Sequence, residues 1–223
     1  MQPVDLLGWL AVLLTFLRLG SQPWHNLRRR RVEGLSAAAV GNNLVSDVGW
    51  LCFGVAVGLP PVWVVSVVLL PVDLLTLWVA RSRIDRTAVV STTLWSIALV
   101  GAWLLGGSSG LGAVLVVSVA VILFPQVVAV LRLDHLDGLS LVTMALAFGE
   151  AGVWSVYGLL IGDATLFWYG AVLAVGTAII TWRVLVTRPA VSPTGTSSPS
   201  PGEVAPPSGP ATSPPGDAYT AGP

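Results

Sequence analysis

The sequence predicts an all-α integral membrane protein with seven transmembrane helices, arranged as two parallel three-helix repeats joined by an inversion linker helix. Three observations predict this fold class. First, 54% of the 223 residues are apolar, 10% are charged and the mean hydropathy is +0.82, as is typical of proteins that cross the membrane several times. Second, ten residues of the first half recur in the second half at one constant offset. Third, the arginines lie in or beside alternate loops.

The repeated residues form a register without gaps. In the first half they are Gln22, Leu27, Arg28, Gly34, Leu35, Ser36, Trp50, Gly54, Gly58 and Trp78. Their counterparts are Gln126, Leu131, Arg132, Gly138, Leu139, Ser140, Trp154, Gly158, Gly162 and Trp182. Internal repeats in membrane proteins usually frame a translocation path. The sequence therefore predicts a duplicated helical bundle with a path between its halves.

Seven apolar segments are each close to the length of about 20 residues that a membrane-spanning helix needs. We place them at 5–24, 35–58, 61–80, 88–106, 110–131, 139–161 and 165–186. Residues 1–84 then form the first repeat and residues 109–188 the second. Three spans reverse the direction of the chain, so a fused second triplet would insert upside down. We predict that residues 85–108 form a linker helix that restores its orientation.

The arginines indicate the orientation of the helices. They lie in or beside alternate loops, as Arg28 to Arg31, Arg81, Arg83, Arg86, Arg132, Arg183 and Arg188. The intervening loops, at 58–61, 106–110 and 162–163, contain no arginine. By the positive-inside rule, we expect the N-terminus outside and the C-terminus in the cytosol. Arg18 lies within a span, near its cytosolic end, where we expect its side chain to snorkel to the headgroups.

Residues 189–223 are rich in Pro, Ser, Thr, Gly and Ala. Such a segment cannot bury a core, so we predict a disordered cytosolic tail. The chain has no lysine and much Gly, Ala, Val and Arg, which hints at a GC-rich bacterial genome. We expect a multi-pass protein of the bacterial plasma membrane, in contact with membrane lipids, whose small-residue faces would allow a homo-oligomer.

The second repeat contains four motifs, namely Phe124-Pro125-Gln126, Leu131-Arg132, Asp137-Gly138-Leu139-Ser140 and Trp154-x-x-Tyr157-Gly158. They resemble the PQ-loop family, and within it most closely the SWEET and SemiSWEET (MtN3-type) transporters. The resemblance covers about residues 5–80 and 110–187. In the first repeat Ser21-Gln22-Pro23 stands where Pro-Gln is expected. The resemblance implies a transporter that works by alternating access.

Proline inside a helix removes a backbone hydrogen bond and kinks the helix. A neighbouring glutamine amide is well suited to satisfy the freed carbonyl group. We therefore predict a gating hinge at Pro125 and Gln126, with a degenerate counterpart at Gln22 and Pro23. The alternative is that these prolines only shape static helices.

Three acidic residues, Asp47, Asp73 and Glu150, lie inside predicted spans. Acidic residues in a bilayer are costly and are often functional, for example as sites that bind and release a proton. We predict that Glu150, Asp47 and Asp73 are candidates for proton coupling. The alternative for each is a structural hydrogen bond, such as one from Asn43 to Asp47.

The resemblance implies that Trp50 and Trp154, and the residues one turn before them, face a central substrate cavity. It also places an asparagine in the third helix of each SWEET triplet, at the positions that hold Ser66 and Gly170 here. The substrate-binding candidates are Ser46, Trp50, Ser66, Glu150, Trp154 and Gly170. Tryptophans outside the repeated motifs, such as Trp95 and Trp103, are expected at the membrane interface or in contact with lipid.

The resemblance favours facilitated transport of a sugar. Glu150 and the two missing asparagines favour an alternative, proton-coupled transport of an amino acid or another small polar metabolite. A second alternative is a receptor that recruits a partner through its tail and transports nothing. We do not expect an enzyme, because no residues supply a nucleophile, a base and an oxyanion donor together. We also expect no cofactor, metal ion or nucleic acid.

Overall fold

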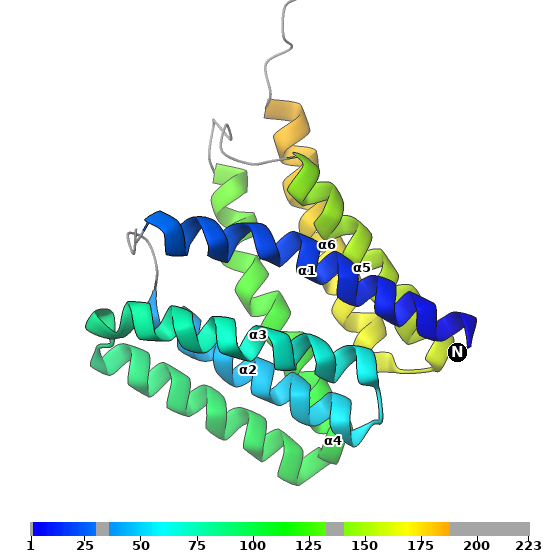
Figure 1. Cartoon of the computed structure of the whole chain (residues 1–223), viewed down its shortest axis with the longest axis horizontal. Coiled ribbons are helices and arrows are strands. Elements are labelled where there is room, and N and C mark those ends of the chain that lie inside the picture. Colours follow the sequence, from blue (N-terminus) through cyan, green and yellow to red (C-terminus); the bar gives the residue numbers. More distant parts are fainter. Residues whose placement is uncertain (1, 30–35, 133–140, 188–223) are drawn as a thin grey trace, which may run out of the picture. The chain divides into compact units, whose positions relative to one another are not determined.

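The computed structural model of the chain (Figure 1) describes residues 2–29, 36–132 and 141–187. The chain divides into two units, Met1–Arg188 and Pro189–Pro223, and all described residues lie in the first unit. The predicted disordered tail lies outside the described residues. The described elements are α1 (Pro3–Arg29), α2 (Ala37–Ala56), α3 (Pro60–Val79), the short 3-10 helix η1 (Ala80–Arg83), α4 (Arg86–Arg132), α5 (Leu141–Ile161) and α6 (Ala164–Thr187). The predicted all-α class is confirmed.

Several of these helices can cross a membrane. Among the described residues, four stretches are long and apolar enough, namely Pro60–Arg83, Arg86–Phe124, Thr143–Ile161 and Ala164–Thr187. Large apolar side chains also lie on the outside of the helices, and Leu105 is 93% exposed. A water-soluble protein would bury such surface, so the chain is a multi-pass membrane protein. The number of spans and their direction stay predictions.

Helix α4 has 47 residues and includes both predicted segments 88–106 and 110–131. Its regular helix is broken at Gly107, where φ is 59° and ψ is −145°. Residues with a side chain rarely adopt this conformation, which is nearly restricted to glycine. The break therefore separates two helical stretches at the point where the sequence predicts a loop.

Replacing Gly107 by alanine is expected to lower the free energy of unfolding by about 1–3 kcal/mol, the usual cost of such a backbone conformation. A Cβ atom at this position would meet nothing within 4 Å, so the loss would come from the backbone alone. Gly106→Ala is the matched control, because that position also has open space and no positive φ is recorded there. Denaturant titration in detergent measures both variants. An equal effect of the two substitutions would contradict the prediction.

The two halves of the chain have the same turn. Gly58 between α2 and α3 has φ 69°, and Gly162 between α5 and α6 has φ 73°. The next residue in each turn donates its N–H to a glycine carbonyl five residues back, from Leu59 to Gly54 and from Asp163 to Gly158, both at 2.8 Å. This is a glycine-terminated helix end. The repeated glycines of the sequence therefore have one structural role in both halves.

The helices pack in the same order in both halves. Helix α3 contacts both α1 and α2, and α6 contacts both α4 and α5. Between the halves, α1 packs on α5 and α2 packs on α4. The largest buried cluster includes Phe53 and Val62 from the first half, and Tyr157 and Leu166 from the second. The halves are therefore joined by two equivalent helix pairs and a shared apolar core.

Candidate functional site

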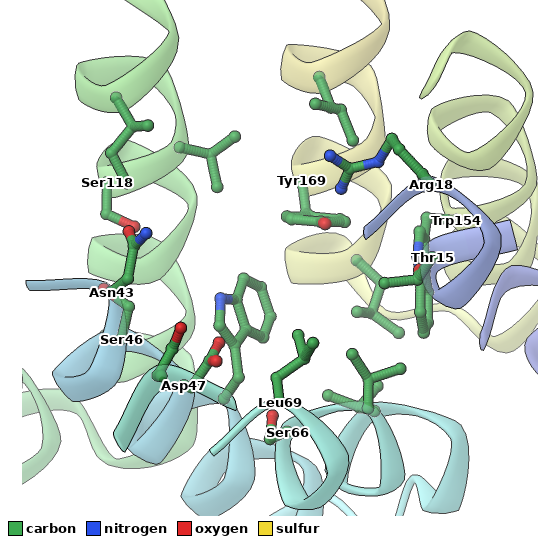
Figure 2. Close-up of a pocket in the computed structure, with 18 of the residues that line it drawn as sticks. Thr15, Arg18, Asn43, Ser46, Asp47, Ser66, Leu69, Ser118, Trp154 and Tyr169 are labelled. Atoms are coloured by element: carbon green, nitrogen blue, oxygen red, sulfur yellow. Dashed lines mark hydrogen bonds between the residues drawn. The ribbon is translucent and has the colours of Figure 1, made fainter. Parts of the chain in front are cut away.

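A cavity of about 370 Å³ lies between helices of both halves (Figure 2). Its volume is within the range of small-molecule sites. Residues from all six α-helices line it. The predicted site residues that the structure brings together at the cavity are Ser46, Asp47, Trp50, Ser66, Asp73 and Trp154.

Three aromatic side chains form one group at the cavity. The Tyr169 ring lies 5.1 Å from that of Trp50 and 6.2 Å from that of Trp154, centroid to centroid, and both pairs are edge-to-face. Tyr169 therefore connects Trp50 and Trp154 across the cavity wall. Sequence reasoning missed Tyr169. The repeat register carries no signal for it, since Val65 stands at the equivalent position of the first half.

Glu150 is fully buried, with 0% of its surface exposed, and is not among the residues that line the cavity. Its carboxylate forms an ion pair with the Arg18 Nε, and Arg18 Nη2 lies 3.3 Å from its Oε1. The Thr15 hydroxyl lies 2.8 Å from the same oxygen. Trp154 Nε1 in turn donates to that hydroxyl at 3.4 Å. Thr15 and Arg18, but not Glu150, line the cavity wall at this place.

This arrangement corrects two expectations. Arg18 was expected to snorkel to the headgroups, but its side chain points to Glu150 instead. Glu150 was expected at the substrate cavity, but it lies behind Arg18 and Thr15. A charge in an apolar bundle is very costly unless it is paired. The ion pair gives both Arg18 and Glu150 a partner of opposite charge. Because Arg18 belongs to α1 and Glu150 to α5, the ion pair also connects the two halves.

Asp47 of α2 and Asp73 of α3 both line the cavity, and their carboxyl groups are close enough to interact. The sequence predicts each acid separately, with an asparagine as the structural partner of Asp47. A hydrogen bond between two carboxyl groups requires a proton on one of them. The second half has Ala151 and Thr177 at the equivalent positions. The carboxyl pair is therefore a feature of the first half alone.

Trp95 corrects another expectation. It was expected at the membrane interface or in contact with lipid, but it is half-buried and its indole Nε1 donates to the Ser46 hydroxyl at 2.9 Å. One turn earlier, the Asn42 side-chain amide donates to the Ser91 hydroxyl at 3.1 Å. The first stretch of α4 therefore makes polar contacts with α2 and reaches a residue of the cavity wall.

Comparison with known proteins agrees with this geometry. Residues 4–63 match the family model of the PQ loop repeat. The chain is similar to a solved structure of a eukaryotic SWEET transporter, with a TM-score of 0.63 and 15% sequence identity. The alignment covers 82% of this chain and 98% of the SWEET chain. This chain contains a PQ-loop repeat and has a SWEET-like fold. The resemblance stated from the motifs is confirmed. No curated protein matches the chain.

The SWEET-like fold gives different places to the two residues that stand at the asparagine positions. Ser66 lines the cavity and is 2% exposed. Gly170 is not among the residues that line the cavity, so its role in substrate binding stays a prediction. A Cβ atom at Gly170 would lie 2.5 Å from the backbone oxygen of Ala151 and 2.5 Å from the backbone nitrogen of Ser155. Gly170 therefore lets α6 approach α5 closely.

The PQ-loop motifs contain the residues of the predicted hinge. The backbones of Gln22 and Pro23 lie in α1, and those of Pro125 and Gln126 lie in α4. Their side chains are outside the described part of the structure. The hinge therefore stays a prediction. The repeat and the fold together suggest a membrane transporter.

Proposed function

We propose that this protein is a membrane transporter that moves a small polar solute by alternating access. The observation that carries the proposal is the cavity, because its polar and aromatic walls come from both halves of the chain. Such a cavity between repeats is where transporters of this construction bind their substrates. The PQ-loop repeat and the SWEET-like fold support the same function.

The packing on the two sides of the cavity supports alternating access. On the side of the Gly58 and Gly162 turns, buried residues of both halves pack in one cluster. The other buried cluster in the described residues, with its core at Val130, Ile180 and Val184, lies in the second half alone. The proposal includes the arrangement of three, one and three spans with the N-terminus outside. In that orientation, the side closed by both halves is the outer one.

Facilitated transport of a sugar is the first version of this proposal. Indole and phenol rings can stack on the C–H faces of a sugar, and Trp50, Trp154 and Tyr169 supply three such rings. Ser46 and Ser66 add hydroxyl groups that can bind sugar hydroxyls. The asparagines of the SWEET pattern are absent, so these two serines would take over the polar contacts.

Proton-coupled transport of an amino acid or another metabolite is the second candidate. Asp47 and Asp73 favour it, because a carboxyl pair at the cavity can hold and release a proton. Figure 2 shows Asp47 and Arg18 at opposite sides of the pocket. Opposite charges on two walls suit a solute with an ammonium and a carboxylate group. Glu150 is a weaker candidate for coupling, because it is engaged by Arg18 and Thr15.

Uptake into proteoliposomes tests both versions. The panel is labelled D-glucose, sucrose, L-alanine and L-arginine, each with and without an inward proton gradient. We expect Trp154→Ala to reduce uptake at least about tenfold, the effect of losing about 1.4 kcal/mol of binding. Trp182→Ala is the matched control, because Trp182 is exposed and does not line the cavity.

The outcomes separate the two candidates. Glucose or sucrose uptake that ignores the gradient supports the sugar version. Gradient-driven uptake of an amino acid that is lost in Asp47→Asn supports the proton-coupled version. If no solute of the panel enters liposomes with the wild-type protein, the proposed function is contradicted.

A further inference from the structure

The first stretch of α4 lies along α2 in parallel. Gly41 is close to Thr92, Ser46 contacts Trp95, and Gly49 is close to Leu99, so residue numbers rise together along the two helices. Position 41 is tightly packed, since a Cβ atom there would lie 2.4 Å from the Thr92 hydroxyl oxygen. This contact fixes the register of the first α4 stretch along α2, and so places Trp95 beside Ser46.

The hydrogen bond from Trp95 determines what the Ser46 hydroxyl can do. An indole N–H can only donate, whereas a serine hydroxyl has one hydrogen and accepts through its oxygen. Because Ser46 accepts from Trp95, its own hydrogen is left for another acceptor. Several other hydroxyls in these helices donate to a carbonyl three or four residues earlier, as do those of Thr76, Ser96, Ser118, Thr177, Thr181 and Thr187. No such bond is made by Ser46 among the described residues, and Ser46 lines the cavity.

We infer that Trp95 is a positioning residue of the substrate site, which holds the Ser46 hydroxyl as a hydrogen-bond donor to an oxygen of the solute. The inference rests on the proposed function and adds a specificity determinant to it. The acceptor on the solute is a hydroxyl, carbonyl or carboxylate oxygen. Trp95 does not line the cavity, so it would act on the solute only through Ser46.

The second half has no equivalent of this device. The counterpart of Ser46 is Glu150, which is enclosed by Arg18 and Thr15, whereas the polar contacts of the first α4 stretch described above are made with α2. The linker stretch therefore makes the two walls of the cavity chemically different. A solute with its acceptor oxygen at one end would bind in one orientation.

Uptake kinetics of single and double variants test the inference. The probe is whichever of D-glucose and L-alanine the wild-type protein carries faster. We expect Trp95→Phe to raise the apparent KM about fivefold, the typical effect of one hydrogen bond, with the maximal rate within about twofold. Ser46→Ala should raise KM similarly. Adding Trp95→Phe to Ser46→Ala should change KM no further, because the two residues act as one unit.

Two controls accompany these variants. Trp103→Phe changes a more exposed tryptophan of the same helix stretch that does not line the cavity, and it should leave KM unchanged. Ser46→Thr keeps the hydroxyl. Its KM should stay at the wild-type value if the effect of Ser46→Ala comes from the lost hydrogen bond and not from changed packing. An unchanged KM in Trp95→Phe, or additive effects of Trp95→Phe and Ser46→Ala, would overturn the inference. Absence of wild-type uptake would instead overturn the proposed function and this role of Ser46 with it.

Discussion

Replacing Glu150 by glutamine is expected to lower the free energy of unfolding by about 3 kcal/mol, which is typical of breaking a buried ion pair. Glutamine has the size of glutamate and can still accept a hydrogen bond from the Thr15 hydroxyl. It removes the negative charge, however, and leaves the Arg18 guanidinium in an apolar bundle with only 24% of its side chain exposed. Unfolding of the purified protein in a detergent titration measures the loss.

A second substitution distinguishes the lost charge pair from a simple loss of packing. In the double variant Arg18→Met with Glu150→Gln, both charges are absent, so we expect most of the lost stability to return. Arg83→Gln is the matched control, because Arg83 is exposed, and its effect should stay within about 0.5 kcal/mol. The explanation fails if the double variant is less stable than Glu150→Gln alone.

The repeat register predicts a large part of this site. It places Trp50 and Trp154 at equivalent positions, and the structure brings both to the cavity. Asp47 also precedes Trp50 by three residues, and in a helix this spacing places both on one face. Both placements can be made from the sequence, because a repeat and a helical period are properties of the local sequence. They state which face of a helix a residue occupies, but not which residue of another helix it meets.

The contacts that sequence reasoning missed all join residues that are distant in the chain. Arg18 and Glu150 are 132 positions apart, and Ser46 and Trp95 are 49 positions apart. Arg18 near the end of a span is equally compatible with snorkelling and with pairing, and only the position of α5 decides between them. Tyr169 was missed for a related reason, because it breaks the register and a family pattern pointed to its neighbour Gly170.

Replacing Gly170 by alanine is expected to destabilise the protein by about 1–3 kcal/mol or more, the usual cost of forcing extra atoms into a packed interface. The new Cβ atom would lie 2.5 Å from two backbone atoms of α5, the Ala151 oxygen and the Ser155 nitrogen. Backbone atoms cannot rotate away as the end of a side chain can. Helices α5 and α6 would therefore have to separate, beside a cavity that Trp154 and Tyr169 line together.

Gly152→Ala in α5 gives the opposite expectation. A Cβ atom there would meet nothing within 4 Å, and alanine in a helix is favoured over glycine by about 1 kcal/mol. Detergent unfolding should thus show loss of stability for Gly170→Ala and a gain for Gly152→Ala. If Gly170→Ala were as stable as the wild type, the close approach of α5 and α6 would be refuted.

The same geometry bears on sugar recognition. An asparagine introduced at Gly170, to restore the SWEET pattern, carries the same Cβ atom and meets the same two backbone atoms. We therefore expect Gly170→Asn to lose stability at least as strongly as Gly170→Ala, and not to gain sugar uptake. In this chain, the residue at position 170 lies at the close contact between α5 and α6. Whatever polar contacts the solute makes with the second half must come from other residues, and Tyr169 is the polar residue of α6 that the cavity offers.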